Sequence, residues 1–248
     1  MGWVIRLLRQ PELALYWQML QLPKVIGHRG AAAYAPENTL VSFREARRRG
    51  ATWVEADIVL TADDVPIVMH DDSLKRTTGI DRLVAETRRA DLPTDVPTFE
   101  EAIACWGELG LGCNVEIKPT KGREAETARA VVETLRRCWP SHLPQPLLSS
   151  FQDASLAVAH AAAPEFARAL LIRELADDWR PRAEAVAAQG INTDGKRLTA
   201  VRAVEIRKAG YALGVYTIND GDVAKALVGM GVDCVITDAP DVILAALG

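Results

Sequence analysis

The chain has 248 residues, of which 49% are hydrophobic and 25% are charged, and its formal net charge is −4 at pH 7. This composition is that of a globular protein and excludes a disordered chain, which has too few apolar residues to form a core. The small acidic excess argues against a general nucleic-acid-binding protein, which presents a basic face, but it leaves room for a local cationic pocket that binds phosphate.

The cysteines indicate a reducing compartment. None of the four belongs to a Cys-x-x-Cys pair, and each lies in an apolar or helical context. Such cysteines behave as small buried side chains, so we predict a cytoplasmic protein without disulfides or a zinc site. They are Cys105, Cys113, Cys138 and Cys234.

Residues 1–23 are predicted to form a helical extension that precedes a folded domain over residues 24–248. Arg6, Arg9 and Pro11 interrupt its apolar residues and no small-residue cleavage site follows, so the pattern does not fit a signal peptide. No apolar run reaches the roughly 20 residues that a membrane span needs. The extension either packs on the domain or, through Trp3 and Trp17, contacts a membrane surface.

Beyond residue 23, short apolar runs of strand length alternate with longer segments of helical periodicity. Predicted strands cover residues 25–27, 53–59, 65–69, 113–117, 147–150, 167–172, 190–193, 212–217 and 234–236. Predicted helices cover residues 39–49, 98–106, 123–138, 153–162, 180–189, 200–209, 221–230 and 240–247. Residues 71–97 show little periodicity and are predicted to form a short inserted loop, called the insertion below.

Strands that alternate with helices imply parallel pairing through right-handed crossovers. Apart from the short run at 65–69, the pattern holds eight strand–helix units, the number that closes a TIM (β/α)8 barrel. An open doubly wound sheet more often has five or six strands, and no Gly-x-Gly-x-x-Gly follows any strand here. We therefore predict an α/β fold of the TIM-barrel class, with the insertion on a loop at the active-site end.

Polar side chains interrupt two of the predicted apolar strands. Glu55 and Asp57 lie two residues apart, so both point to one face, and Glu116 and Lys118 repeat that spacing on the next barrel strand. Three converging carboxylates are costly to bury unless a cation joins them. A hard divalent cation, Mg2+ or Ca2+, is the natural partner of such oxygen ligands. The structural alternative is that the acids pair with basic neighbours or cap loop amides.

Two histidines lie at the ends of the first two barrel units. His28 follows the strand at 25–27, and His70 precedes the insertion. Because imidazole titrates near neutral pH, such a pair can act as acid and base near a phosphorus centre. The other histidines, His142 and His160, are interpreted as surface residues, since one lies in a Pro-rich loop and the other on a helix face.

Six motifs in order carry a resemblance to one enzyme family. They are His28-Arg29-Gly30, Pro36-Glu37-Asn38-Thr39, Glu55-x-Asp57, His70-Asp71-x-x-Leu74-x-Arg76-Thr77-Thr78, Pro97-Thr98-Phe99-x-Glu101 and Glu116-Ile117-Lys118. With Thr237-Asp238-x-Pro240 near the C-terminus, the chain from about Lys24 onwards resembles the glycerophosphodiester phosphodiesterases of the bacterial cytoplasmic type. Each motif alone is weakly specific, whereas six in order are strong.

The resemblance implies a TIM-barrel enzyme that hydrolyses small glycerophosphodiesters to glycerol 3-phosphate and an alcohol such as choline or ethanolamine. It also implies roles for matching residues: the divalent cation on Glu55, Asp57 and Glu116, the acid and base as His28 and His70, and phosphate contacts from Arg29 and Lys118. The resemblance gives no oligomeric state and no order for the two histidines.

The aromatic residues of the expected pocket depart in part from the family pattern. Tyr216 stands where the family usually has tryptophan, whose ring is expected to pack on the glycerol carbons. Phe151 matches an aromatic residue at the pocket wall. Both are predicted to contact substrate, with plain barrel packing as the alternative. The short, charged insertion is predicted to leave the site open to water-soluble diesters rather than long acyl chains.

Two other functions fit parts of the pattern. A phospholipase D-type enzyme acting on lysophospholipids would use the same metal and histidines, but it would need apolar loops for the lipid tail. A non-catalytic barrel that binds phosphate would be expected to lose a histidine or a metal acid, whereas this chain keeps all five residues.

Overall fold

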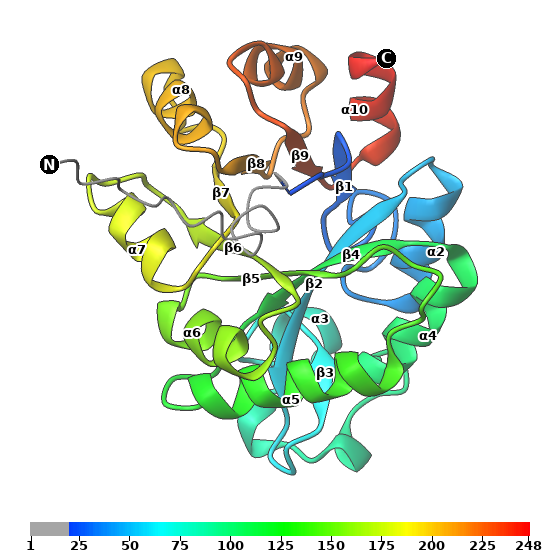
Figure 1. The fold of residues 1–248 in the computed structure, drawn as a ribbon. Coiled ribbons are helices and arrows are strands. Elements are labelled where there is room, and N and C mark those ends of the chain that lie inside the picture. The colour runs from blue at the N-terminus through cyan, green and yellow to red at the C-terminus, as the bar shows by residue number, and fades with distance from the viewer. Residues whose placement is uncertain (1–19) are drawn as a thin grey trace, which may run out of the picture.

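The computed structural model describes residues 20–248, and within them eight parallel strands close into a barrel (Figure 1). The ring closes where β1 (Val25–Gly27) pairs with both β2 (Trp53–Leu60) and β9 (Cys234–Thr237). The other ring strands are β4 (Gly112–Ile117), β5 (Leu147–Ser150), β6 (Ala167–Ile172), β7 (Gly190–Asp194) and β8 (Ala212–Tyr216). The predicted TIM barrel is therefore confirmed.

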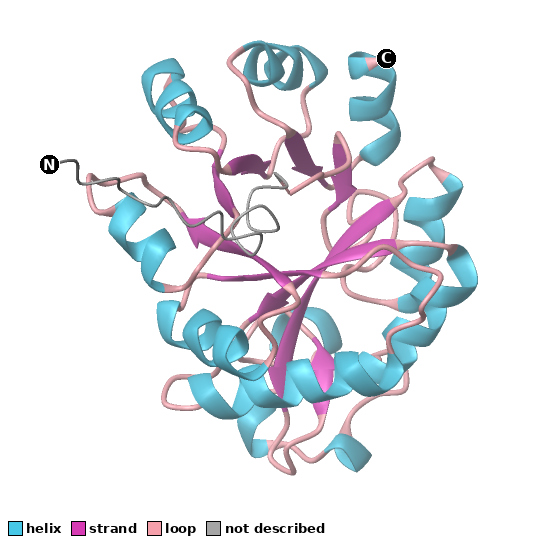
Figure 2. Ribbon diagram, in the orientation of Figure 1, coloured by secondary structure: helices cyan, strands magenta, loops and turns pink. Residues whose placement is uncertain are grey.

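Helices surround the strands, which lie at the centre of the molecule (Figure 2). They are α2 (Leu40–Arg48), α4 (Phe99–Leu109), α5 (Glu124–Cys138), α6 (Asp153–Ala162), α7 (Trp179–Ala185), α8 (Ala200–Lys208), α9 (Gly221–Gly229) and α10 (Pro240–Leu247). With the exception of α7, their ends lie within three residues of the predicted ends.

The helix predicted over residues 180–189 ends early, because a buried arginine takes the carbonyl groups at its end. Arg168 of β6 is 1% exposed, and its guanidinium donates to the carbonyl oxygens of Val186 at 3.1 Å and Ala187 at 2.9 Å. Ala187 has a left-handed φ of 47°. The carbonyls of the two residues that follow α7 thus find a partner on β6, and the chain turns into β7 there.

The insertion is more structured than the predicted loop. β3 (Pro66–Val68) runs antiparallel to β2 outside the ring and leads into it. The insertion contains the short helix α3 (Lys75–Thr78) and the 3-10 turns η1 (Val84–Glu86) and η2 (Arg89–Asp91). An apolar cluster anchors it to β2 and β3, consisting of Val59, Ile67, Met69, Leu74, Val84, Leu92 and Val96. Local apolar contacts therefore hold this cap against the barrel.

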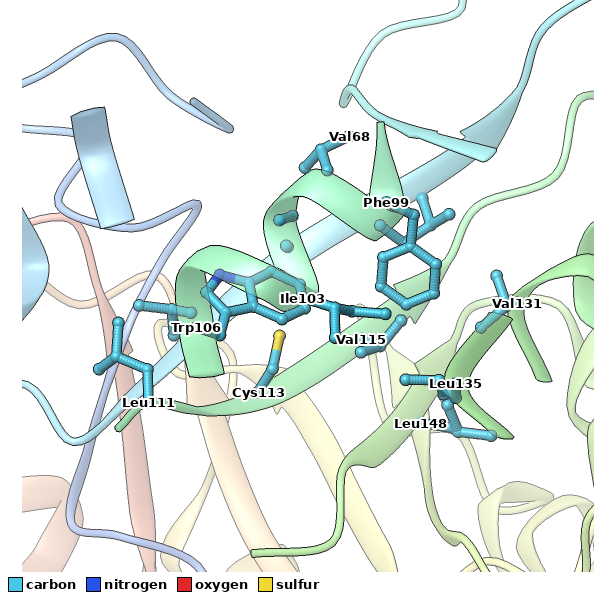
Figure 3. Packing of buried hydrophobic residues seen from close by; sticks show 14 of the residues in the cluster. Val68, Phe99, Ile103, Trp106, Leu111, Cys113, Val115, Val131, Leu135 and Leu148 are labelled. Atoms are coloured by element: carbon cyan, nitrogen blue, oxygen red, sulfur yellow. The ribbon is translucent and has the colours of Figure 1, made fainter. Parts of the chain in front are cut away.

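Trp106 of α4 is the centre of an aromatic cluster between helices and strands (Figure 3). Its ring meets Phe43 and Phe99 edge-on, at centroid distances of 5.3 and 6.1 Å. Cys113 and Val115 of β4 belong to the same buried cluster. Edge-to-face aromatic pairs are directional, so the pair with Phe43 fixes α4 against α2, and the buried cluster extends to β4, the strand that carries Glu116.

Thr98 begins α4 with a capping box, and its loss is expected to destabilise the protein. Its hydroxyl accepts the backbone N–H of Glu101 at 3.2 Å, and the Glu101 carboxylate accepts the backbone N–H of Thr98 at 2.7 Å. We expect Thr98→Ala to lower the free energy of unfolding by about 1 kcal/mol, measured by urea denaturation. The exposed Thr94 offers a control in Thr94→Ala, and equal midpoints for both variants would contradict the role of the cap.

Three further expectations concern membrane-spanning helices, the cysteines and the N-terminal extension. Among residues 20–248, no helix is both long and apolar enough to cross a bilayer. All four cysteines are free thiols. Most of the predicted N-terminal helical extension, residues 1–19, lies outside the residues that the structure describes.

Candidate active site

Three carboxylates meet on adjacent strands of the barrel. Glu55 and Asp57 lie on β2, and Glu116 lies on β4, whose register places it beside Asp57. One carboxylate oxygen of each residue lies within 4.8 Å of those of the other two. Glu55 is 4% exposed and Asp57 is 1% exposed. The structure thus places the three predicted metal acids side by side, with Glu55 and Asp57 buried and Glu116 half-buried.

Two of these acids form no ion pair with an arginine or a lysine within the described residues. Burial raises the pKa of Glu55 and of Glu116, and the charge of Asp57 raises both further. Within residues 20–248, the only ion-pair partner of Glu55 is the His28 ring, with Nε2 at 3.9 Å, and Glu116 has none. No arginine or lysine therefore pairs with these two carboxylates to offset the cost of ionising them.

Asp57 is the better compensated member of the cluster. Its carboxylate lies 3.3 Å from Nε of Arg29 and 3.5 Å from Nζ of Lys118, and it accepts a hydrogen bond of 2.9 Å from the Asn38 amide. Pairing with basic neighbours therefore accounts for one acid of the three. An oxygen-only donor set that is short of positive charge fits a hard divalent cation such as Mg2+ or Ca2+.

His28 directly follows β1 and is held by Asp238, which directly follows β9, the last strand of the ring. Its Nδ1 lies 2.6 Å from Oδ1 of Asp238, whose other carboxylate oxygen accepts a hydrogen bond from Asn219 at 2.7 Å. Burial alone would lower the pKa of His28, but the hydrogen bond with Asp238 and the charge of Glu55 outweigh it, so the pKa is raised. The surroundings of His28 favour the imidazolium.

His70 lies next to the insertion and lines the same cavity as His28. Its Nδ1 is 2.6 Å from Oδ1 of Asp71. Burial lowers the pKa of His70, and the charge of Asp57 and the hydrogen bond with Asp71 offset only part of that effect. Because the two histidine pKa values move in opposite directions, one ring is suited to donate a proton and the other to accept one.

A tight turn after β1 brings Arg29 into the site. Arg29 and Gly30 both have left-handed backbone, with φ of 50° and 91°. A Cβ on Gly30 would overlap the Ser42 hydroxyl, so this position requires glycine. The turn aims the backbone N–H of Arg29 at Oε2 of Glu55, at 3.0 Å, and its side chain donates to Glu37 at 2.8 Å. One short segment thus holds a carboxylate of the cluster and presents a guanidinium.

Aromatic and polar side chains complete the wall of this cavity, whose volume is about 170 Å3. The rings of Phe151 and Tyr216 pack edge-on, with centroids 6.0 Å apart. The Tyr216 hydroxyl and Oδ1 of Asn114 are buried and lack a hydrogen-bond partner within the described residues. A cavity lined by an aromatic pair together with charged and polar side chains is suited to a small ligand that has both apolar and polar groups.

The predicted set of site residues omitted three side chains that hold the others in place. Asp238 contacts His28, Asp71 contacts His70, and Asn38 contacts Asp57. All three belong to motifs noted in the sequence, but a motif does not show which side chain its members contact. A signal existed for Asp238, because the last strand of a closed barrel neighbours the first.

A sequence model described as "Glycerophosphoryl diester phosphodiesterase family" matches residues 28–242. Among curated proteins, a glycerophosphodiester phosphodiesterase of Bacillus altitudinis is 27% identical over 237 residues, which cover 89% of this chain and 96% of that protein. Glycerophosphodiester phosphodiesterase 1 of Homo sapiens is 42% identical over a shorter stretch of 95 residues, which cover 32% of this chain and 29% of that protein.

Solved structures agree with these matches. An Oleispira antarctica phosphodiesterase in complex with the product sn-glycerol-3-phosphate has a TM-score of 0.89 and 38% identity, covering 91% of this chain and 97% of that chain. A glycerophosphodiester phosphodiesterase from Thermotoga maritima has a TM-score of 0.74 and 26% identity, covering 92% of this chain and 99% of that chain.

Proposed function

Because this chain belongs to the glycerophosphoryl diester phosphodiesterase family, we propose that it hydrolyses glycerophosphodiesters to glycerol 3-phosphate and an alcohol by histidine acid–base catalysis at a divalent cation. The catalytic domain covers residues 24–248, with residues 71–97 as its cap. One observation carries the proposal: two imidazoles and two carboxylates line a single cavity, with a third carboxylate beside them. A cytoplasmic location stays a prediction.

The cation would be held by the carboxylates of Glu55, Asp57 and Glu116. The fit rests on the donor set, since two of the three clustered acids form no ion pair with an arginine or lysine within the described residues. A bound Mg2+ or Ca2+ supplies positive charge that polarises phosphoryl oxygens and favours the charge that develops on them.

His28 and His70 move the protons of the reaction in this proposal. One imidazole removes the proton of the substrate's glycerol hydroxyl as that oxygen forms a bond to phosphorus, and the other protonates the alcohol oxygen as its bond to phosphorus breaks. The resulting cyclic phosphate is opened by water with the two roles exchanged. The aspartate on Nδ1 of each ring, Asp238 or Asp71, fixes the orientation that this exchange requires.

Four side chains would bind the substrate. Arg29 and Lys118 already lie beside Asp57, where they can offset negative charge on the phosphoryl oxygens. Phe151 and Tyr216 line the cavity and offer an apolar wall for the glycerol carbons. The product named for the Oleispira antarctica structure, sn-glycerol-3-phosphate, supports a substrate of this size.

The test is release of glycerol 3-phosphate from glycerophosphocholine by the full chain, with Mg2+ or Ca2+ and with a chelator. We expect product with a metal and none with the chelator. Absence of product under every metal would overturn the enzymatic proposal, and equal rates with the chelator would overturn the role of the cation. Lysophosphatidylcholine in parallel tests the lipid alternative, because preferred release of choline from it would favour a phospholipase D-type enzyme.

Metal binding is also expected to change stability in a pH-dependent way. In the chelated protein, Glu55 and Glu116 have raised pKa values and hold protons that the unfolded chain has released, so stability should fall as pH rises from about 5 towards 8. A cation removes this cost, and saturating Mg2+ at about 100 times its dissociation constant adds about 2.7 kcal/mol. We expect the gain in Tm on adding Mg2+ to be larger at pH 8 than at pH 6, because at pH 6 the cation must displace protons.

Calorimetry of the full chain, with and without a chelator, measures this difference. The same Tm with and without Mg2+ at both pH values would contradict a metal site at these acids. A gain that shrinks as pH rises would contradict the sign derived from the raised pKa values.

A further inference from the structure

Arg76 lies on α3, and its guanidinium is held by carboxylates from two separate segments. Nε and Nη2 donate to Asp71 at 2.6 and 3.1 Å. Nη1 and Nη2 donate to Glu37, in the loop between β1 and α2, at 2.8 and 2.6 Å. In such forked pairs an arginine fixes the orientation of a carboxylate as well as compensating its charge.

Each of these carboxylates also holds a residue of the cavity. Asp71 Oδ1 lies 2.6 Å from Nδ1 of His70, and Glu37 Oε1 accepts from Nη1 of Arg29 at 2.8 Å. Nε of Arg29 in turn lies 3.3 Å from Asp57. The contacts run from the His70 imidazole through five groups of alternating charge, in the order Asp71, Arg76, Glu37, Arg29 and Asp57.

The position of Arg76 argues for an orienting role over a stabilising one. Its side chain is 50% exposed, and exposed ion pairs contribute little to stability. The hydrogen bonds from Arg76 are the largest influence on the pKa of both carboxylates. They lower the pKa of Asp71, and they lower the pKa of Glu37 to about 2. Without the guanidinium, Glu37 and Asp71 would repel each other and turn apart.

We propose that Arg76 is a positioning residue that orients His70 and Arg29 together, and so makes the geometry of the reacting groups depend on the cap. The inference rests on the proposed function for the roles of those two residues. When the guanidinium is removed, Asp71 and Glu37 are free to rotate, and the imidazole and the second guanidinium lose their common anchor. Displacements of about 1 Å at reacting groups cost on the order of 100-fold in rate.

The test compares Arg76→Ala and Arg76→Lys with Lys75→Gln in the metal-loaded full chain. Lys75 is a matched control, since it precedes Arg76 on α3 and its pair with Asp81 is exposed to solvent. We expect Arg76→Ala to lower kcat for glycerophosphocholine by about 10- to 100-fold, with a smaller rise in KM because Arg29 also contacts the substrate in the proposed function. Arg76→Lys should keep part of the activity, because an ammonium retains the charge without the fork. Millimolar guanidinium should restore kcat of Arg76→Ala, and urea should not.

Three results would overturn the proposal. The first is equal kcat for Arg76→Ala and Lys75→Gln. The second is a loss of kcat that guanidinium does not restore, which would indicate a merely structural role. The third is an unchanged NMR signal of the His70 Nδ1 proton, identified by its loss in His70→Ala. We expect that signal to shift in Arg76→Ala and to stay in Lys75→Gln.

The NMR signal of His70 tests the role of Arg76 independently of the proposed function. It needs no turnover, so an inactive wild-type chain would count against the proposed function alone, while the His70 signal would still report on Arg76. If Arg76→Ala does not fold, the same spectral comparison in Arg76→Lys decides the question.

Discussion

The largest loss of activity is expected from His70→Ala, which should lower kcat for glycerophosphocholine by about 100- to 10,000-fold. The imidazole lines the cavity, its Nδ1 is held by Asp71, and the proposed reaction needs a proton acceptor and a proton donor in each half. The loss should appear in steady-state kcat at saturating metal. Mg2+ should still raise the Tm of the variant, because the ring is not among the three clustered acids.

Two other histidines provide controls for that experiment. His160 lies on α6 and His142 lies in an exposed loop where its ring contacts the carbonyl of Gly107, and neither lines the cavity. We expect His160→Ala and His142→Ala to keep the wild-type kcat. If His70→Ala were as active as these two controls, the assignment of His70 as an acid–base residue would be contradicted.

The second large effect is expected from Glu116→Gln, which should change activity and stability in opposite directions. The substitution keeps the size of the side chain but removes a negative charge from the cluster. Activity at a fixed, limiting Mg2+ concentration should fall by at least about 100-fold, since even residues that only support a metal ligand cost 10- to 100-fold. The chelated variant should be more stable at pH 8 than chelated wild type by about 1 kcal/mol or more, because a buried unpaired charge is gone.

Calorimetry and an Mg2+ titration measure both halves of this prediction. The exposed Glu133 of α5 supplies the matched control, Glu133→Gln, which removes the same charge far from the cluster in the chain. A Glu116→Gln variant that still gains Tm with Mg2+ as the wild type does would contradict a ligand role for Glu116. A less stable chelated variant would contradict the claim that its charge is uncompensated.

Much of this site could be predicted because it depends on strand periodicity. The spacing of Glu55 and Asp57 puts both on one face of a strand, and the parallel pairing of consecutive barrel strands places Glu116 beside them. These inferences need only the two-residue repeat of a strand and the neighbour relations of a parallel barrel.

The remainder depends on contacts that periodicity does not encode. The hydrogen bond between His28 and Asp238 joins residues 210 positions apart and exists because β9 pairs with β1. The early end of α7 follows from the buried guanidinium of Arg168, a residue that an isolated strand pattern would place at the surface. The insertion is held in a defined structure by its apolar contacts with β2 and β3. Its charged sequence, taken alone, does not predict these contacts.

Anomalous diffraction from crystals grown with Mn2+, a substitute for Mg2+ at oxygen sites, tests the central claim most directly. We expect one strong peak between the carboxylates of Glu55, Asp57 and Glu116, at roughly 2.0–2.6 Å from an oxygen of each, as for hard cations with oxygen ligands. A map with no peak there, while Arg29 and Lys118 remain on Asp57 and the other two carboxylates stay apart, would contradict it.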